Sequence, residues 1–275
     1  MWTSATAPVI AKPIGGERSH HTMTSPSMAT EALFVAVVLG VAAIFIYAVL
    51  KMVHSREHPD RGRFGVVVIV LVFWLVVPAV LANQGVLDRY SPPPAPGFIL
   101  VGLITLGTVV LAFSAFGSRL AAGIPLAGLV GYQVFRVPLE WVLHELYSEG
   151  VIPVQMTYAG QNFDVVTGVL AAALGLWLWA GHRAVWLVAA WNIIGLALLA
   201  NIVTIAILST PVPFRYFMND PANLLPSTFP YVWLPTFLVQ AALFGHLLVF
   251  RAISRNVTPT HWTRRPQAGA AERER

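Results

Sequence analysis

The sequence has 275 residues, of which 57% are hydrophobic and only 11% are charged, and its mean hydropathy is +0.70. Because soluble domains carry about 25% charged residues, this composition excludes an ordinary soluble protein. The chain has no cysteine, which excludes disulfides, thiolate metal sites and thiol redox chemistry. The net charge of +5 comes mostly from arginines that flank apolar runs, so it favours membrane orientation over nucleic-acid binding.

Long continuous apolar runs predict an all-α polytopic bundle of seven transmembrane helices. The runs do not alternate in polarity, as the strands of a closed barrel would. We expect the helices at about 29–53, 64–87, 98–116, 120–147, 164–181, 184–208 and 233–253. Residues 1–28 and the basic residues 254–275 are expected to be disordered tails, with Met1, Met23 and Met28 all open as the true start.

The fourth predicted helix is unusually long, because 120–147 at ~1.5 Å per residue exceeds a ~30 Å hydrocarbon core. It must therefore tilt, kink or project from the membrane. Pro138 is expected to bend it, since proline leaves the carbonyl of Val134 without its helical donor. Gly123, Ala127 and Gly131 form a row of small residues that predicts close packing against another helix.

The distribution of lysine and arginine predicts that the N-terminus lies outside and the C-terminus in the cytoplasm. Of the 17 lysines and arginines, 12 fall on one side of the predicted helices, four fall on the other side, and Arg136 lies inside a helix. The predicted loops 148–163 and 209–232 then lie on the outer side. The second of them contains five prolines and is long enough to suggest a functional role.

Polar residues form a stripe along one face of the fourth predicted helix. At about 100° per residue, its five members fall within an arc of roughly 80°. They are Gln133, Arg136, Glu140, His144 and Tyr147. Because lipid cannot solvate charged groups, the stripe must face protein or water. Arg136 and Glu140 are four residues apart, which favours a salt bridge between them.

Other polar residues gather at the outer ends of neighbouring helices. Asn162 and Asp164 begin the fifth predicted helix, where one is expected to cap the helix while the other faces the stripe. We therefore predict a ligand-binding site made of Gln133, Arg136, Glu140, His144, Asn162, Asp164, Arg215 and Asp220. Asn192, Gln240 and His246 are expected to form hydrogen bonds between helices.

A metal site is the main alternative for part of this stripe. The segment HELYS at 144–148 matches the zinc motif H-E-x-x-H except at its last position, where Ser148 replaces the second histidine. Glu140 and His144, with Asp164 or Glu149 adding a further ligand, remain a possible ligand set. We nevertheless expect no metal and no cofactor, and we assign no catalytic residue.

Two segments resemble bacterial polytopic integral membrane proteins to which no activity is assigned. They are QVFRVPLEWVLHELYSEGVIPVQMTYAGQNFD at 133–164 and LANIVTIAILSTPVPFRYFMNDPANLLP at 199–226, and the resemblance covers about residues 30–255. It transfers no role to any residue. We expect a multi-pass protein of the bacterial inner membrane.

Three functional hypotheses follow from these features. The favoured one is a membrane protein that binds or transports a small solute at an outward-facing polar site on the fourth helix, with Arg136 as an anion anchor. The alternatives are a metal-assisted intramembrane enzyme and a scaffold or assembly subunit. The expected partners are the lipid bilayer and a small-molecule ligand, but no nucleic acid, and the oligomeric state stays open.

Overall fold

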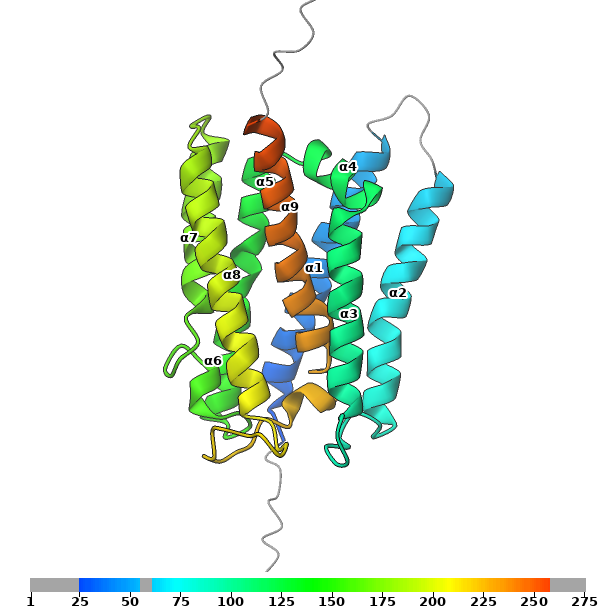
Figure 1. Cartoon of the computed structure of the whole chain (residues 1–275), viewed down its shortest axis with the longest axis vertical. Coiled ribbons are helices and arrows are strands. Elements are labelled where there is room, and N and C mark those ends of the chain that lie inside the picture. The colour runs from blue at the N-terminus through cyan, green and yellow to red at the C-terminus, as the bar shows by residue number, and fades with distance from the viewer. Residues whose placement is uncertain (1–24, 55–60, 258–275) are drawn as a thin grey trace, which may run out of the picture.

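A computed structural model describes residues 25–54 and 61–257 of the chain. All regular secondary structure within these ranges is helical, which agrees with the expected all-α class. Figure 1 shows the long helices side by side in one bundle, with α1 beginning at the lower end and α9 finishing at the upper end. The predicted tails lie outside the described residues, except for 25–28 and 254–257.

The helices follow one another along the chain, and the longest segments between them fall at 84–95, 149–163 and 209–232. Their bounds are α1 Met28–His54, α2 Arg61–Asn83, α3 Pro96–Phe113, α4 Ala115–Gly123, α5 Leu126–Gly131, η1 Tyr132–Phe135, α6 Arg136–Ser148, η2 Val154–Met156, α7 Asp164–Trp179, α8 Val185–Leu208, η3 Leu225–Ser227, η4 Leu234–Leu238 and α9 Val239–Val257. The segments 149–163 and 209–232 lie at the lower end of the bundle in Figure 1, which we call the loop end.

Several helices are long and apolar enough to cross a membrane, so the protein is membrane-embedded. Within the described ranges, five helices meet this test, or six if one bent pair of helices counts as a single span. The expected number is seven. The helix that falls short is α7, whose 16 residues extend about 24 Å at ~1.5 Å per residue, less than a ~30 Å hydrocarbon core.

The long fourth helix expected over 120–147 is broken near its start. Residues Ala115–Gly123 form the separate helix α4, bent by 108° from the segment Leu126–Ser148. The break lies at Pro125, which has no N–H to donate and disfavours a helical conformation at the preceding residue. Ile124 is accordingly extended, with φ −99° and ψ 129°. The Pro125 carbonyl then accepts the N–H groups of Gly128 and Leu129 and starts α5.

A short 3-10 segment, η1, connects α5 to α6 just before Pro138. Its tighter winding is visible at Arg136, whose backbone N–H donates to the carbonyl of Gln133 three residues earlier. Three residues make about one full turn of a 3-10 helix. Gln133 and Arg136 therefore share one face, as the stripe requires, although the winding differs from the uniform helix assumed from the sequence.

Glycines on α7 bring this helix close to α5 and α6. A Cβ atom added to Gly175 would lie 3.1 Å from the Cα of Gly131 and 3.4 Å from the carbonyl oxygen of Ala127. Ala127 and Gly131 therefore pack against another helix, as their small-residue row predicts, whereas Gly123 belongs to α4. Two turns nearer the start of α7, a Cβ at Gly168 would lie 3.2 Å from the Cβ of Arg136. This close approach carries the start of α7 to the polar stripe.

Candidate functional site

Arg136 is the centre of a buried polar cluster between α6 and α7. Its side chain is only 1% exposed, and its Nη1 atom forms an ion pair with Oδ1 of Asp164 at the start of α7. The prediction of a salt bridge between Arg136 and Glu140 on the same helix is therefore wrong. Because α7 packs closely against α6, the carboxylate comes from Asp164 of that helix. Asp164 is also buried, so the pair is shielded from solvent.

Asn162 connects Glu140 to the start of α7. Its Nδ2 donates to Oε1 of Glu140 at 2.6 Å and to the carbonyl of Met156 at 3.1 Å. Its Oδ1 accepts the backbone N–H of Asp164 at 3.1 Å. Neither residue caps α7 as expected, because Phe163 occupies the N-cap position; Asn162 instead bonds the first N–H of the helix, and Asp164 binds Arg136.

Gln133 fixes η1 against α9. The side chain is fully buried, and its Nε2 donates to the carbonyl of Ala242 at 2.9 Å. Space for this contact depends on Gly245, where a Cβ atom would lie 2.6 Å from Nε2 of Gln133. The inner half of the stripe therefore lies within protein rather than lipid.

Several polar atoms of this cluster are buried and have no hydrogen-bond partner. They are Nε and Nη2 of Arg136, Oε2 of Glu140 and Oε1 of Gln133. More than 90% of buried polar groups in proteins are paired, and each exception costs about 1–3 kcal/mol. Two unpaired donors and two unpaired acceptors thus lie on neighbouring turns of the segment from Gln133 to Glu140.

A second polar pair, His246 and Asn192, lies on α9 and α8. Nδ2 of Asn192 donates to the His246 carbonyl at 3.0 Å, and Oδ1 of Asn192 lies 2.7 Å from Nδ1 of His246. Hydrogen bonds between helices are expected for both residues, and the structure contains them. Because Oδ1 can only accept, Nδ1 carries the ring proton, and the unpartnered Nε2 is an acceptor.

His246 lies closer to the cluster than its position in the sequence suggests. A Cβ atom at Gly195 of α8 would lie 2.5 Å from Cε1 of His246 and 2.8 Å from Cγ2 of Thr167 on α7. Nε1 of Trp191 also donates to the Thr167 carbonyl, at 3.2 Å. Three helices therefore meet one turn beyond Asp164. The sequence contains a signal for this meeting point. Asn192 and Gly195 of one predicted helix lie at a membrane depth similar to that of His246 in the other.

His144 lies apart from the cluster, toward the surface of the bundle. Its ring stacks on Tyr158 with centroids 4.5 Å apart, and Tyr147 beyond it is exposed. Glu140 and Asp164 bind Asn162 and Arg136 instead, so the ligand set of the metal alternative is not brought together. In the part of the chain that the structure describes, no group of three or more histidine or carboxylate side chains is placed to hold a metal ion.

Arg215 and Asp220 also lie away from the stripe, in the segment 209–232. Arg215 donates to the carbonyls of Phe217 and Asn219 within its own loop, at 2.7 and 2.6 Å, and Asp220 is exposed. These contacts shape the loop and leave Arg215 turned to its own backbone. Neither side chain contributes to the surroundings of Arg136.

Gln155, which the sequence did not single out, joins the two segments of the loop end. This buried side chain accepts from Nδ2 of Asn219 at 2.8 Å and donates to Oγ of Ser209 at 2.9 Å. It follows α6 in the segment 149–163, which also contains Met156 and Asn162. The segment 209–232 is thus fastened over the residues that hold Glu140.

Comparison with known proteins returns no match: no family model, no curated protein and no solved structure is similar to this chain. The function therefore has to be argued from the site itself.

Proposed function

We propose that the protein binds a small polar solute at the cluster formed by Arg136, Glu140 and Asp164, and that it carries this solute into or across the membrane. The unpaired atoms of the cluster support this most directly. Arg136 has two buried donors without a partner, and Glu140 and Gln133 each have one buried acceptor. In a membrane protein such groups are costly, and they mark substrate pathways more often than structural contacts.

The charges of the cluster limit the chemistry of the solute. Asp164 neutralises Arg136, so Glu140 provides the remaining charge. A solute that bears both an acceptor and a donor fits best. Its carboxylate or carbonyl would accept from Nε and Nη2 of Arg136, and its donor would reach Oε2 of Glu140. A proton on Oε2 would instead neutralise the charge of Glu140 when the site is empty of solute, which would couple binding to protonation.

The loop end is the proposed access route from outside the cell. The excess of lysine and arginine on the opposite side supports an external N-terminus, a cytoplasmic C-terminus and a location in the bacterial inner membrane. Counting α7 as a seventh span is supported by its place beside α8 in Figure 1. The hydrogen bonds of Gln155 to Ser209 and Asn219, which join the two loop segments, would then have to break for the solute to reach Glu140.

Ligand-induced stabilisation of the purified protein tests this proposal. A metabolite that binds only the folded protein raises its stability by about 2.7 kcal/mol at a hundredfold excess over the dissociation constant. We expect such a rise for the unmodified chain and for Glu145→Gln, since Glu145 lies on the same helix and bonds Trp141 at the surface. Arg136→Gln and Glu140→Gln should lose it.

A scaffold role is the second candidate, because the hydrogen bonds around Arg136 connect α6, α7 and α9. On this reading the cluster only orients helices. Replacing both members of a buried ion pair by apolar residues is often tolerated. If Arg136→Leu with Asp164→Leu folds and every cellular phenotype of the protein is retained, the scaffold role replaces solute binding.

A further inference from the structure

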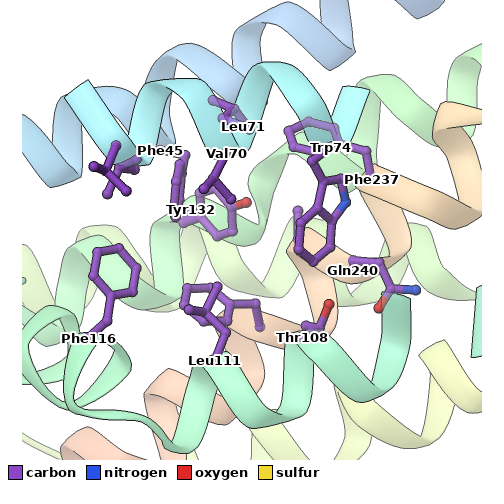
Figure 2. A pocket seen from close by; sticks show the side chains of 14 residues that line it. Phe45, Val70, Leu71, Trp74, Thr108, Leu111, Phe116, Tyr132, Phe237 and Gln240 are labelled. Atoms are coloured by element: carbon purple, nitrogen blue, oxygen red, sulfur yellow. The ribbon is translucent and has the colours of Figure 1, made fainter. Parts of the chain in front are cut away.

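A separate apolar pocket is lined by Tyr132 of η1 but by no residue of the Arg136 cluster. Its cavity volume is about 280 Å³, and it is bounded by α1, α2, α3, α4, η1, η4 and the start of α9. Phe45 and Phe116 lie at one end of the pocket, and Trp74, Thr108 and Gln240 lie at the other (Figure 2). Nearly all of its wall is hydrocarbon, so its occupant must have a large apolar body.

The pocket opens toward the surroundings of α2 rather than toward the loop end. Val66 and Val70 line it, yet these side chains are 60% and 50% exposed. The helix α2 is also the least buried of the long helices and lies at the edge of the bundle in Figure 1. Because the exposed face of an apolar spanning helix meets lipid, molecules reach this pocket from the bilayer.

Two indole groups hold α2 in place beside the pocket. Nε1 of Trp74 donates to the carbonyl of Thr236 at 2.7 Å, and Nε1 of Trp233 donates to the carbonyl of Leu75 at 2.8 Å. The bonds run in opposite directions between α2 and the segment that consists of Trp233 and η4. The wall that α2 contributes is therefore fixed, and it does not depend on apolar contacts alone.

One end of the pocket carries an acceptor that lacks a donor. Gln240 is 3% exposed, and its Nε2 donates to Oγ1 of Thr105 at 3.0 Å and to the carbonyl of Pro235 at 2.9 Å. Both bonds fix the carboxamide, and its Oε1 has no partner. Pro235 lies in the π-helical turn η4, a type of irregularity that frequently occurs at functional sites. Tyr132 places its hydroxyl between Val70 and Trp74 (Figure 2).

We propose that this pocket binds a bilayer lipid that has a long apolar body and one hydroxyl group. The hydroxyl donates to Oε1 of Gln240, and the apolar body runs past Tyr132 toward Phe45 and Phe116. The orphan acceptor selects for a hydroxyl, since an alkane or an ester leaves it unpaired. This binding is independent of the solute site, although Tyr132 precedes Arg136 by about one turn.

Fluorescence quenching tests the proposal with two probes, a long-chain alcohol brominated at the carbon next to its hydroxyl-bearing carbon and the alkane of the same length brominated at the same position, so that the bromine lies near Trp74 when the hydroxyl binds Gln240. The full chain is used in detergent micelles, and Trp74→Phe identifies the contribution of the pocket indole. We expect the alcohol to quench Trp74 saturably, with an affinity about tenfold higher than that of the alkane. Gln240→Leu should remove this difference between the two probes.

Two equivalent substitutions on α2 supply the control. Val70→Phe fills the pocket, whereas Val76→Phe makes the same change at an exposed position that does not line it. Saturable quenching should be lost in the first variant and retained in the second. Ala241→Phe fills the pocket from α9 and should behave like Val70→Phe. Equal quenching in Val70→Phe and Val76→Phe, or equal affinity of the unmodified chain for alcohol and alkane, would overturn the proposal.

Discussion

Arg136 pairs with Asp164 on a neighbouring helix, although Glu140 lies one turn away on its own helix. The consequence is that Glu140 accepts only one hydrogen bond, from Asn162, and keeps its Oε2 atom free. The two carboxylates thus differ in their surroundings. Asp164 balances a buried cation, whereas Glu140 keeps an unsatisfied oxygen, which is the atom that the proposed solute would bind.

We predict that Asp164→Asn destabilises the protein far more than Glu140→Gln. Asp164→Asn leaves a buried guanidinium without its counterion, which typically costs about 3–5 kcal/mol. Glu140→Gln keeps an oxygen for Asn162 and should cost less than about 1 kcal/mol. Unfolding of each variant in detergent measures the difference. Equal losses of stability would show that both carboxylates serve the fold.

The double substitution Arg136→Leu with Asp164→Leu should be more stable than Asp164→Leu alone. The single change strands a charge in an apolar setting, whereas the double change removes both charges and their desolvation cost. A double-mutant cycle on the same unfolding measurement gives the coupling between the residues. If the two effects simply add, Arg136 and Asp164 do not stabilise each other.

A hydrogen-bonded clasp joins Glu149, at the end of α6, to Ser27 and Thr30 at the start of α1. This clasp should make the stability of the protein fall at acidic pH. Glu149 accepts from Thr30 Oγ1 at 2.7 Å and from the backbone N–H of Ser27 at 3.0 Å. Partial burial tends to raise the pKa of Glu149, but the hydrogen bonds from Ser27 and Thr30 outweigh it, so its pKa lies below the ordinary glutamate value. Its contribution is therefore complete above that ordinary value and is lost as pH falls through the lowered pKa.

Glu149→Gln tests this clasp, with Glu145→Gln, one turn earlier on α6, as the control. Thermal unfolding below neutral pH should show a smaller acid-induced loss for Glu149→Gln than for the control. The effect is modest, because Glu149 is only partly buried and solvent screens its interactions. Identical pH profiles for the two variants would contradict the role of Glu149.

Glycine substitutions should separate the helix contacts that build the site from those that do not. Gly195→Ala would bring a Cβ atom to within 2.5 Å of Cε1 of His246, so we expect a loss of about 1–3 kcal/mol. Gly102→Ala on α3 meets nothing within 4 Å and should be neutral or stabilising by a few tenths of a kcal/mol. The reverse order of stability would exclude close packing of α7, α8 and α9 at Gly195.

The helical class and the burial of Gln133, Arg136 and Glu140 could be predicted because both follow from local patterns. Apolar runs define helices, and a polar stripe must turn away from lipid. The partner of Arg136 could not be predicted, since an i, i+4 pair is visible in the sequence but the rotation of α7 is not. Pro125 is a helix-breaking residue that could be recognised in the sequence, but the length of the apolar run around it suggested one continuous helix.

The loop end was harder to predict than the helices. Arg215 and Asp220 belong to a polar loop, and polarity alone does not tell which side chains face inward. Gln155 looks ordinary in the sequence, yet its amide can accept from Asn219 and donate to Ser209 at once. Such bridges depend on tertiary placement of irregular segments, for which no periodic pattern exists.

The most direct test of solute binding is the affinity of a stabilising metabolite for three forms of the protein: the unmodified chain, Glu140→Gln and Glu145→Gln. A hydrogen bond to a charged buried group contributes about 1.5–3 kcal/mol, so Glu140→Gln should weaken binding roughly ten- to hundredfold. Glu145→Gln should leave the affinity unchanged. If all three forms bind the metabolite equally, the polar cluster is not its site, and the cluster serves only to hold the helices together.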